Sequence, residues 1–407
     1  MSDWLKETRA LRLVAADLNG VGRGKRMPIE AAEKTATSGS RFPFSALNVD
    51  IWGEDIEDSP LVLESGDRDG FLYPTERGLL PVPWLTTPTA MQPIWMFDED
   101  GTPFDGDPRH ALAAVEQRYT DKGLQPVVAT ELEFYLVALS DTGELTAPKA
   151  PMSQDHSQIG NVLSVWELDR FDPFLTALYD GCAAMGIPAE TATSEVGVGQ
   201  FEFTLTHQAS AIKAADDTWF FKMLVKGLAR QHGFAATFMA KPYLDQAGTG
   251  LHMHFSVLDG DGRNVFDDGT DTGTPMLHHA IGGCLDALAD STVIFAPHAN
   301  SYARLVPGAH APTGVCWAYE NRTVAVRVPS GPGVARRIEH RCAGGDVNPY
   351  LSIAAVLGAA LNGIEDAQTP PLPITGNAYD QDMPQMHANW TKAIDAFAQS
   401  PQIARIF

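Results

Sequence analysis

Two glutamates two residues apart, Glu131 and Glu133, are the first candidates for chemistry in this sequence. Apolar residues alternate with them across Thr130–Leu136, which predicts a β-strand whose two carboxylates point to one face. Neighbouring carboxylates repel each other, and one pKa rises strongly unless a cation lies between them. An isolated Glu-x-Glu pair is nevertheless more often the solvated face of an edge strand. The pair alone leaves both interpretations open.

Histidines repeat this alternation in a second segment, Gly250–Ser256. His252, His254 and Ser256 share one face of the predicted strand. A lone histidine at such a place is more often a hydrogen-bonded core residue than a ligand. Here two histidines and a serine follow the turn Gly248–Gly250, and glycines let the backbone approach a ligand closely. The combination favours a binding site.

A third acidic pair, Glu195 and Glu202, flanks a glycine-containing stretch. The glycines predict a tight turn that returns both carboxylates to one pocket. This pattern is weak evidence when it stands alone. A ligand set of carboxylates and histidines without cysteine selects a hard divalent ion, Mg²⁺ or Mn²⁺, rather than a structural zinc.

Six arginines lie between Asn300 and Arg341 in a chain that is otherwise acidic. Planar guanidinium groups bind phosphate and carboxylate through paired hydrogen bonds, so anionic substrates are expected here. Glu339 lies among them as a further metal ligand or, more commonly for such a residue, as a salt-bridge partner. Carboxylates, a divalent ion and arginines together are typical of phosphoryl transfer. The six are Arg304, Arg322, Arg327, Arg336, Arg337 and Arg341.

Strands and longer helices that alternate after residue 105 must position these side chains. Asp107 followed by Pro108 is an N-cap signal for the first helix. Before it, glycine turns and scattered prolines predict short strands and loops. We therefore expect a small β-rich domain over 1–105 and a second domain over 106–407. The predicted strands are 11–16, 126–138 and 250–258, and the predicted helices are 171–185, 214–232 and 349–364.

Composition limits the possible partners. The net charge of −22 argues against nucleic-acid binding and suits a cationic substrate. No apolar run is long enough for a membrane span, and the first residues lack the hydrophobic stretch of a signal peptide, so we expect a cytoplasmic protein. The four cysteines show no metal-binding or disulfide spacing and are expected to be free thiols.

Taken together, these segments resemble the glutamine synthetase superfamily over nearly the whole chain. The matching stretches, in order, are Arg23–Lys25, Thr130–Phe134, Glu195–Glu202, Lys241–Pro242, Gly248–His252, Asn300–Leu305, Asn321–Arg322, Arg336–Arg341 and Asn348–Leu351. The resemblance implies an α+β fold with a small N-terminal β-grasp-like domain. The larger catalytic domain would be a curved antiparallel sheet, or half-barrel, flanked by helices. Homo-oligomers of stacked rings, such as dodecamers, with active sites between subunits are also implied.

The resemblance further implies a role for each candidate residue. One divalent ion is expected on Glu133, Glu195 and Glu202, and a second on Glu131, His252 and Glu339. Glutamate is expected at Gly248, Arg304 and Arg341, and the nucleotide at His254, Ser256, Arg322, Arg327 and Arg337. The residues expected to act in catalysis are Arg304, His310, Arg322 and Arg327. The implied reaction is attack of the γ-carboxylate of glutamate on ATP to give an acyl phosphate, from which an amine displaces phosphate.

Departures from the family pattern concern the amine. Ammonia-using members carry a glutamate where this chain has His310, and an Asp-Gly-Ser-Ser turn where it has Phe42–Gly53. The N-terminal region, together with Gly376–Asp380, resembles most the branch that glutamylates amines, especially γ-glutamylputrescine synthetases. We hypothesise that His310 widens or re-polarises the amine pocket. The acidic run Asp50–Asp69 is an entrance for a cationic diamine or, equally well, solvated surface.

Other amines and other classes stay open at this point. Ammonia, methylamine, ethanolamine or another monoamine would fit the same reaction, and a catalytically silent family member is a remote alternative. A guanidino-kinase-like phosphotransferase would share the chemistry but not the ordered motifs. Ala247 and Val334 replace a family asparagine and lysine, so contacts to glutamate and ATP are expected to differ in detail. Relatives usually continue for several helices past the position of Phe407.

Overall fold

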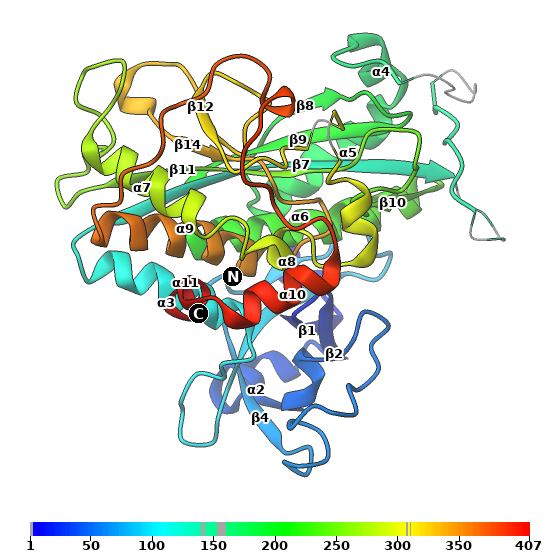
Figure 1. The fold of residues 1–407 in the computed structure, drawn as a ribbon. Coiled ribbons are helices and arrows are strands. Elements are labelled where there is room, and N and C mark those ends of the chain that lie inside the picture. Colours follow the sequence, from blue (N-terminus) through cyan, green and yellow to red (C-terminus); the bar gives the residue numbers. More distant parts are fainter. Residues whose placement is uncertain are drawn as a thin grey trace.

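The structure, a computed structural model, describes residues 3–138, 140, 142, 144–152, 160–306, 308–309 and 311–407. A small N-terminal sheet lies at one end of the molecule, and a larger sheet lies across the other end (Figure 1). Between them run α3 (Pro108–Thr120), α6 (Ala211–Gln231) and α9 (Pro349–Glu365), which cover one face of the larger sheet.

The smaller sheet has the strand order β2-β1-β6-β4-β3, with β5 beside β6. β1 pairs antiparallel with β2 and parallel with β6, and α2 (Ala31–Ser38) packs against β2 and β4. Buried Leu11, Leu13, Leu72 and Met96 form its core. The predicted strand 11–16 is confirmed, and the β-grasp-like description stays a prediction. The strands are β1 Ala10–Ala16, β2 Gly22–Pro28, β3 Ser40–Pro43, β4 Asp69–Pro74, β5 Leu80–Pro81 and β6 Thr89–Phe97.

The larger sheet has the order β12-β13-β14-β11-β7-β9-β8, with β10 beside β7. All its pairs are antiparallel except β12 with β13. The predicted α+β class with a curved half-barrel sheet flanked by helices is confirmed. The strands are β7 Gln125–Ala138, β8 Ala189–Ser194, β9 Gln200–Gln208, β10 Phe234–Thr237, β11 Leu251–Leu258, β12 Trp317–Tyr319, β13 Val326–Val328 and β14 Ile338–His340.

Local signals explain where the helices begin. Asp107 caps α3 by accepting the Arg109 N–H, and Pro108 takes the first position. Ser210 caps α6, so this helix begins three residues before the predicted start at 214. The other helices are α1 Asp3–Glu7, α4 Val165–Arg170, α5 Asp172–Met185, α7 Pro275–Asp286, α8 Thr292–Phe295, α10 Trp390–Gln399 and α11 Pro401–Ile406.

The two parts of the chain meet at the start of α9. The Asn348 side chain caps α9 and also donates to the backbone oxygen of Asp17, at 2.9 Å. Trp219 on α6 donates from its indole to the Gly20 oxygen, also at 2.9 Å. The turn between β1 and β2 is thus held directly on the helices beneath the larger sheet.

The cysteines and the apolar character of the helices bear on two further predictions. All four cysteines are buried and free, as predicted. Among the helices of the described residues, none combines the length and the apolar character that a membrane crossing needs.

Candidate active site

Strand register brings the predicted acidic and histidine residues together on one face of the larger sheet. β7 pairs Glu131 with His252 on β11 and Glu133 with Glu202 on β9. His254 on β11 pairs with Glu339 on β14. The alternation holds here on β7, because Leu132 and Phe134 are fully buried beneath the sheet while Glu131 and Glu133 are only half-buried.

Glu131 lies at the centre of this cluster. His252 Nδ1 is 3.1 Å from one of its carboxylate oxygens, and His254 Nε2 is 3.0 Å from the other. Burial by itself raises the pKa of Glu131, but hydrogen bonds and attraction from the two histidines outweigh it and hold the pKa well below its usual range. Glu131 is therefore an ionised carboxylate, available to a cation.

Glu202 and Glu195 lack comparable partners. Burial first, and then repulsion from Glu131, Glu133 and Glu195, raises the pKa of Glu202 to about 9. Burial and repulsion from Glu133 raise the pKa of Glu195 to about 7. Carboxyl groups in this state favour either a proton or a bound cation. Their side of the cluster has an excess of negative charge.

Glu133 and Glu195 are placed by the turn between β8 and β9. Gln200, which begins β9, accepts the Gly197 N–H and donates to Glu133 Oε2 at 3.1 Å. The Gly250 N–H donates to the same oxygen at 3.0 Å. The Glu195 N–H donates to the Gln200 oxygen, closing the turn that the glycines predict.

Glu339 is held between two arginines. Arg327 Nη1 donates to Glu339 Oε2 at 2.7 Å, and Arg341 donates to Oε1. Burial raises the pKa of Glu339, but the charges of Arg341 and the two histidines lower it to about 2. Glu339 is thus a salt-bridge partner whose oxygens also face the cluster, 4.0 Å from His252 Nδ1.

Arg304 approaches the cluster from behind the Gly248–Gly250 turn. Its guanidinium is buried and donates to the Cys342 oxygen at 2.8 Å. A Cβ atom at Gly248 would lie 2.9 Å from Arg304 Cγ, and one at Gly250 would lie 3.0 Å from Arg304 Nη2. Glycine at these positions is therefore what lets Arg304 lie beside the site.

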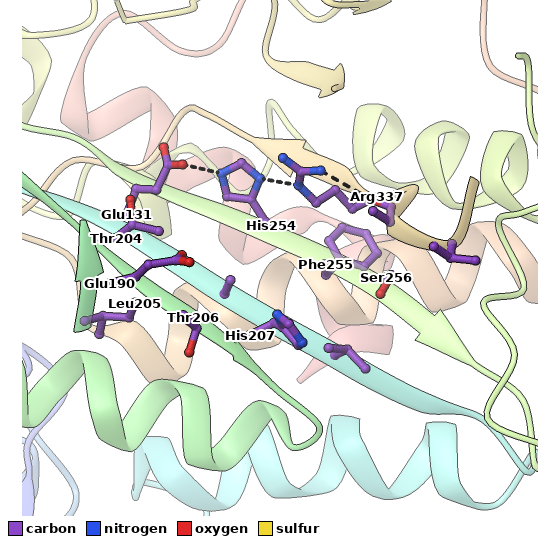
Figure 2. A pocket seen from close by; sticks show the side chains of 14 residues that line it. Glu131, Glu190, Thr204, Leu205, Thr206, His207, His254, Phe255, Ser256 and Arg337 are labelled. Atoms are coloured by element: carbon purple, nitrogen blue, oxygen red, sulfur yellow. Dashed lines mark hydrogen bonds and ion pairs between the residues drawn. The ribbon is translucent and has the colours of Figure 1, made fainter. Parts of the chain in front are cut away.

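A cavity of about 370 Å³ opens next to Glu131. Its walls include His254, Ser256 and Arg337, three residues predicted to face the nucleotide. Figure 2 shows Glu131, His254 and Arg337 in a row, with Arg337 Nε donating to His254 Nδ1 at 3.2 Å. Val334, which replaces a family lysine, also lines this cavity. The cavity is large enough for a small polar ligand beside the cluster.

Two members of the predicted arginine cluster lie elsewhere. Arg336 was grouped with the anion-binding set, and this is wrong, because its guanidinium donates to the backbone oxygens of Thr270 and Asp271 in a surface loop. Arg322 is exposed and reaches the cluster only through its charge on Glu195. His310 lies outside the described residues.

The ligand atoms fall into two groups that share Glu131. One is Glu131, His254 and Glu339, and the other is Glu131, Glu202 and His252, each within 4.8 Å. This grouping places His254, expected toward the nucleotide, among the candidate ligands, and it leaves out Glu133 and Glu195. The division into two sets of three ligands stays a prediction. Oxygen-rich donors with two imidazoles and unbalanced negative charge fit Mg²⁺ or Mn²⁺.

Sequence reasoning missed residues that the fold brings to the site. Glu190 on β8 and His207 on β9 line the cavity, and Glu320 contacts Arg327. Period-two alternation from Glu202 would have found Thr204 and Thr206, which also line the cavity. Glu190 and Glu320 carry no such signal, because they reach the site only once β8 pairs with β9 and β12 pairs with β13.

Comparisons with known proteins agree with this geometry. The glutamine synthetase catalytic domain family matches residues 105–407. The γ-glutamylputrescine synthetase PuuA of Escherichia coli is 36% identical, with 98% of this chain and 84% of the relative covered. The γ-glutamylethanolamide synthetase of Streptomyces coelicolor is 35% identical, with 78% and 68% covered. A solved complex of GmaS with ADP superposes with a TM-score of 0.86 at 27% identity, covering 100% of this chain and 93% of that one.

The half-barrel, its carboxylate–histidine cluster and the buried arginines, together with these relatives, define a nucleotide-using ligase. The chain belongs to the glutamine synthetase family. Within it, the protein is an ATP-dependent carbon–nitrogen ligase that joins glutamate to an amine or to ammonia. This assignment sets aside the guanidino-kinase-like alternative.

Proposed function

We propose that the protein is a γ-glutamylamine synthetase whose preferred amine is putrescine. The observation that carries the proposal is the buried cluster of glutamates and histidines beside a cavity, with Arg304, Arg327 and Arg341 around it. The similarity to a γ-glutamylputrescine synthetase over 98% of this chain supports the choice of amine.

Two divalent ions would be held by the six predicted ligands Glu131, Glu133, Glu195, Glu202, His252 and Glu339. When bound, the ions supply neutralisation of the phosphate charge. Glu195 and Glu202 support this role, because both have raised pKa values that a cation would relieve.

In the first step, an oxygen of the glutamate γ-carboxylate attacks the γ-phosphorus of ATP, and the bond to the β-phosphate oxygen breaks. The products are γ-glutamyl phosphate and ADP. Arg304 and Arg341 hold the glutamate, and Arg327 and Arg337 face the phosphates. Preorganised guanidinium groups stabilise charge that develops on the transferred group.

In the second step, the neutral amine nitrogen attacks the acyl carbon and phosphate leaves. The attacking nitrogen loses one proton to water before the attack and a second proton to the departing phosphate, so that the amide and hydrogen phosphate are released. The acid-rich side of the cluster attracts the incoming cation. The second, distal ammonium of putrescine needs a separate acidic partner. We assign that role to the run Asp50–Asp69.

This assignment requires more than one subunit. The Asp50–Asp69 run is a loop that leads into β4, and its Ile51 lines a cavity against α6 and β10, separate from the cavity beside Glu131. No residue of the run lines the cavity beside Glu131. The proposal therefore includes a homo-oligomer of stacked rings in which the run of one subunit faces the site of its neighbour.

Phosphate release with glutamate, ATP and Mg²⁺ tests the amine directly. We expect kcat/KM for putrescine to exceed that for ammonia and for methylamine. A higher kcat/KM for ammonia would contradict the diamine assignment while leaving the ligase reaction in place. Ethanolamine is the second candidate, because the Streptomyces relative is a γ-glutamylethanolamide synthetase. A higher kcat/KM for ethanolamine than for putrescine would identify ethanolamine as the preferred amine.

His310 offers a second test of amine choice. Ammonia-using family members carry glutamate at this position, so His310→Glu is expected to raise kcat/KM for ammonia relative to putrescine several-fold. Thr313→Ser nearby is a matched control and should leave the ratio unchanged. An unchanged ratio in His310→Glu would show that the position does not select the amine.

A further inference from the structure

Glu320 is a carboxylate at the edge of the site that none of the predicted roles uses. It directly follows β12, and its φ of +56° is in the left-handed region that glutamate rarely adopts. One carboxylate oxygen accepts the Ser330 N–H just after β13. The other lies 3.4 Å from Arg327 Nη2. The backbone and one hydrogen bond therefore fix the carboxylate against Arg327.

Arg327 lies between two carboxylates of different exposure. Its Nη1 donates to Glu339, whose side chain is 1% exposed, and its Nη2 faces Glu320, whose side chain is 51% exposed. The Nε–H of Arg327 is buried and has no partner among the described residues. The guanidinium is thus shared between an inner and an outer acid, and it is not fully satisfied by either.

Glu339 already carries two guanidinium groups, because Arg341 binds its other oxygen. A divalent ion on Glu339 would share that carboxylate with both arginines, and like charges at contact distance repel strongly. Arg341 is held deeper, at 7% exposure, and no second carboxylate contacts it in the described part of the chain. Arg327 is therefore the arginine that can shift, and Glu320 is its alternative partner.

We propose that Glu320 is a positioning residue that holds Arg327 away from Glu339 when Glu339 binds a divalent ion. The role rests on the proposed function, since it requires Glu339 to be a metal ligand. It also keeps the Arg327 guanidinium near the cluster, where it faces the phosphates of the nucleotide. Glu320 itself touches neither substrate nor ion.

Glu320→Gln tests the role with little change in shape. The glutamine oxygen still accepts the Ser330 N–H, but the charge that attracts Arg327 is gone. Mn²⁺ titration of the full-length protein without nucleotide should show an apparent Kd about three- to five-fold higher, as expected from the loss of one partly exposed ion pair. The Mg²⁺ concentration for half-maximal phosphate release should rise to a similar extent, with the KM for glutamate unchanged.

A double-mutant cycle separates this role from a general loss of negative charge. In an Arg327→Gln background, Glu320→Gln should leave the Mn²⁺ affinity unchanged. The same decrease in Mn²⁺ affinity in the wild-type and Arg327→Gln backgrounds, or no decrease in either, would overturn the proposal. Glu365→Gln, which removes an arginine partner at the end of α9, is the control and should not alter Mn²⁺ binding.

Glu320→Gly provides a second variant in case the glutamine disturbs the loop, because glycine adopts positive φ without strain. It should weaken Mn²⁺ binding as Glu320→Gln does, and unchanged binding would count against the role. If the effect of Glu320→Gln on Mn²⁺ affinity still depends on Arg327 but the protein ligates no amine, the proposed function is refuted and the role of Glu320 is not. Absence of Mn²⁺ binding by the wild-type protein would overturn both proposals.

Discussion

Two acid-rich regions of this chain differ in how their charge is held. The cluster around Glu131 is placed by paired strands, and its carboxyl groups are mostly removed from water. The Asp50–Asp69 run is a surface loop, in which Asp50 accepts two backbone N–H groups of its own turn. Large exposed side chains, Trp52 and Leu63, accompany these acids. Register and burial, rather than the number of acids, distinguish a cation site from a charged surface.

The largest expected effect belongs to the buried cluster. Glu202→Gln removes a candidate ligand and part of the excess negative charge, while the shape of the side chain is retained. We expect the rate of phosphate release to fall at least about 10³-fold, because charge neutralisation supplies much of the catalysis in phosphoryl transfer. Asp55→Asn in the exposed loop, assayed at saturating putrescine, is the control for loss of one acid. Activity of Glu202→Gln within ten-fold of wild type would remove Glu202 from the site.

The pH dependence of stability should also differ between the two regions. The pKa of Glu202 is about 9 in the folded protein against an ordinary value of 4.5. The folded state therefore binds this proton more tightly than the unfolded chain, and the contribution of Glu202 to the free energy of unfolding is largest below pH 4.5 and falls as the pH rises to about 9. Glu195, with a raised pKa of about 7, contributes in the same direction.

Urea unfolding from pH 5 to pH 9 in the presence of a chelator measures how the free energy of unfolding changes with pH. Each unit between the two pKa values corresponds to about 1.4 kcal/mol, so Glu202 contributes several kcal/mol at most. Glu202→Gln should flatten the curve, whereas Asp55→Asn should not change it. Mg²⁺ should stabilise the wild-type protein more at pH 9 than at pH 5. A wild-type curve as steep as that of Glu202→Gln would contradict the raised pKa.

Local periodicity was sufficient to predict the strands that carry the cluster. Alternation in Thr130–Leu136 and Gly250–Ser256 places the glutamates and histidines on the correct face, because a strand has a strict period of two. The cap signal at Asp107 and Pro108 gave the start of α3 for the same local reason. These features depend on neighbours in the sequence.

Contacts between distant segments could not be predicted in this way. Arg336 and Arg337 are adjacent in sequence, yet one binds a surface loop and the other reaches His254. Glu190 and Glu320 enter the site through the pairing of β8 with β9 and of β12 with β13, which alternation within one strand does not specify. The sharing of Arg327 between two carboxylates likewise follows from the register of β13 with β14. Composition and residue spacing therefore do not predict these contacts.

The smallest expected effect, on amine binding, decides whether the exposed acids have a function. Asp55, Glu57 and Asp58 are exposed acids of the loop. Changing all three to their amides should raise the KM for putrescine about five- to ten-fold and leave the KM for ATP unchanged, if the loop attracts the diamine. No change in the KM for putrescine would identify the run as solvated surface.

Mixed oligomers then show whether the loop acts on a neighbouring site. Co-assembly of the triple-amide subunit with Glu202→Gln subunits pairs an intact cluster on one chain with an intact loop on another. If the site lies between subunits, some sites in the mixture regain the low KM for putrescine that neither variant shows alone. If the loop serves its own chain, every active site in the mixture keeps the high KM. Because the loop lines none of the cavity beside Glu131 in its own chain, we expect the first result.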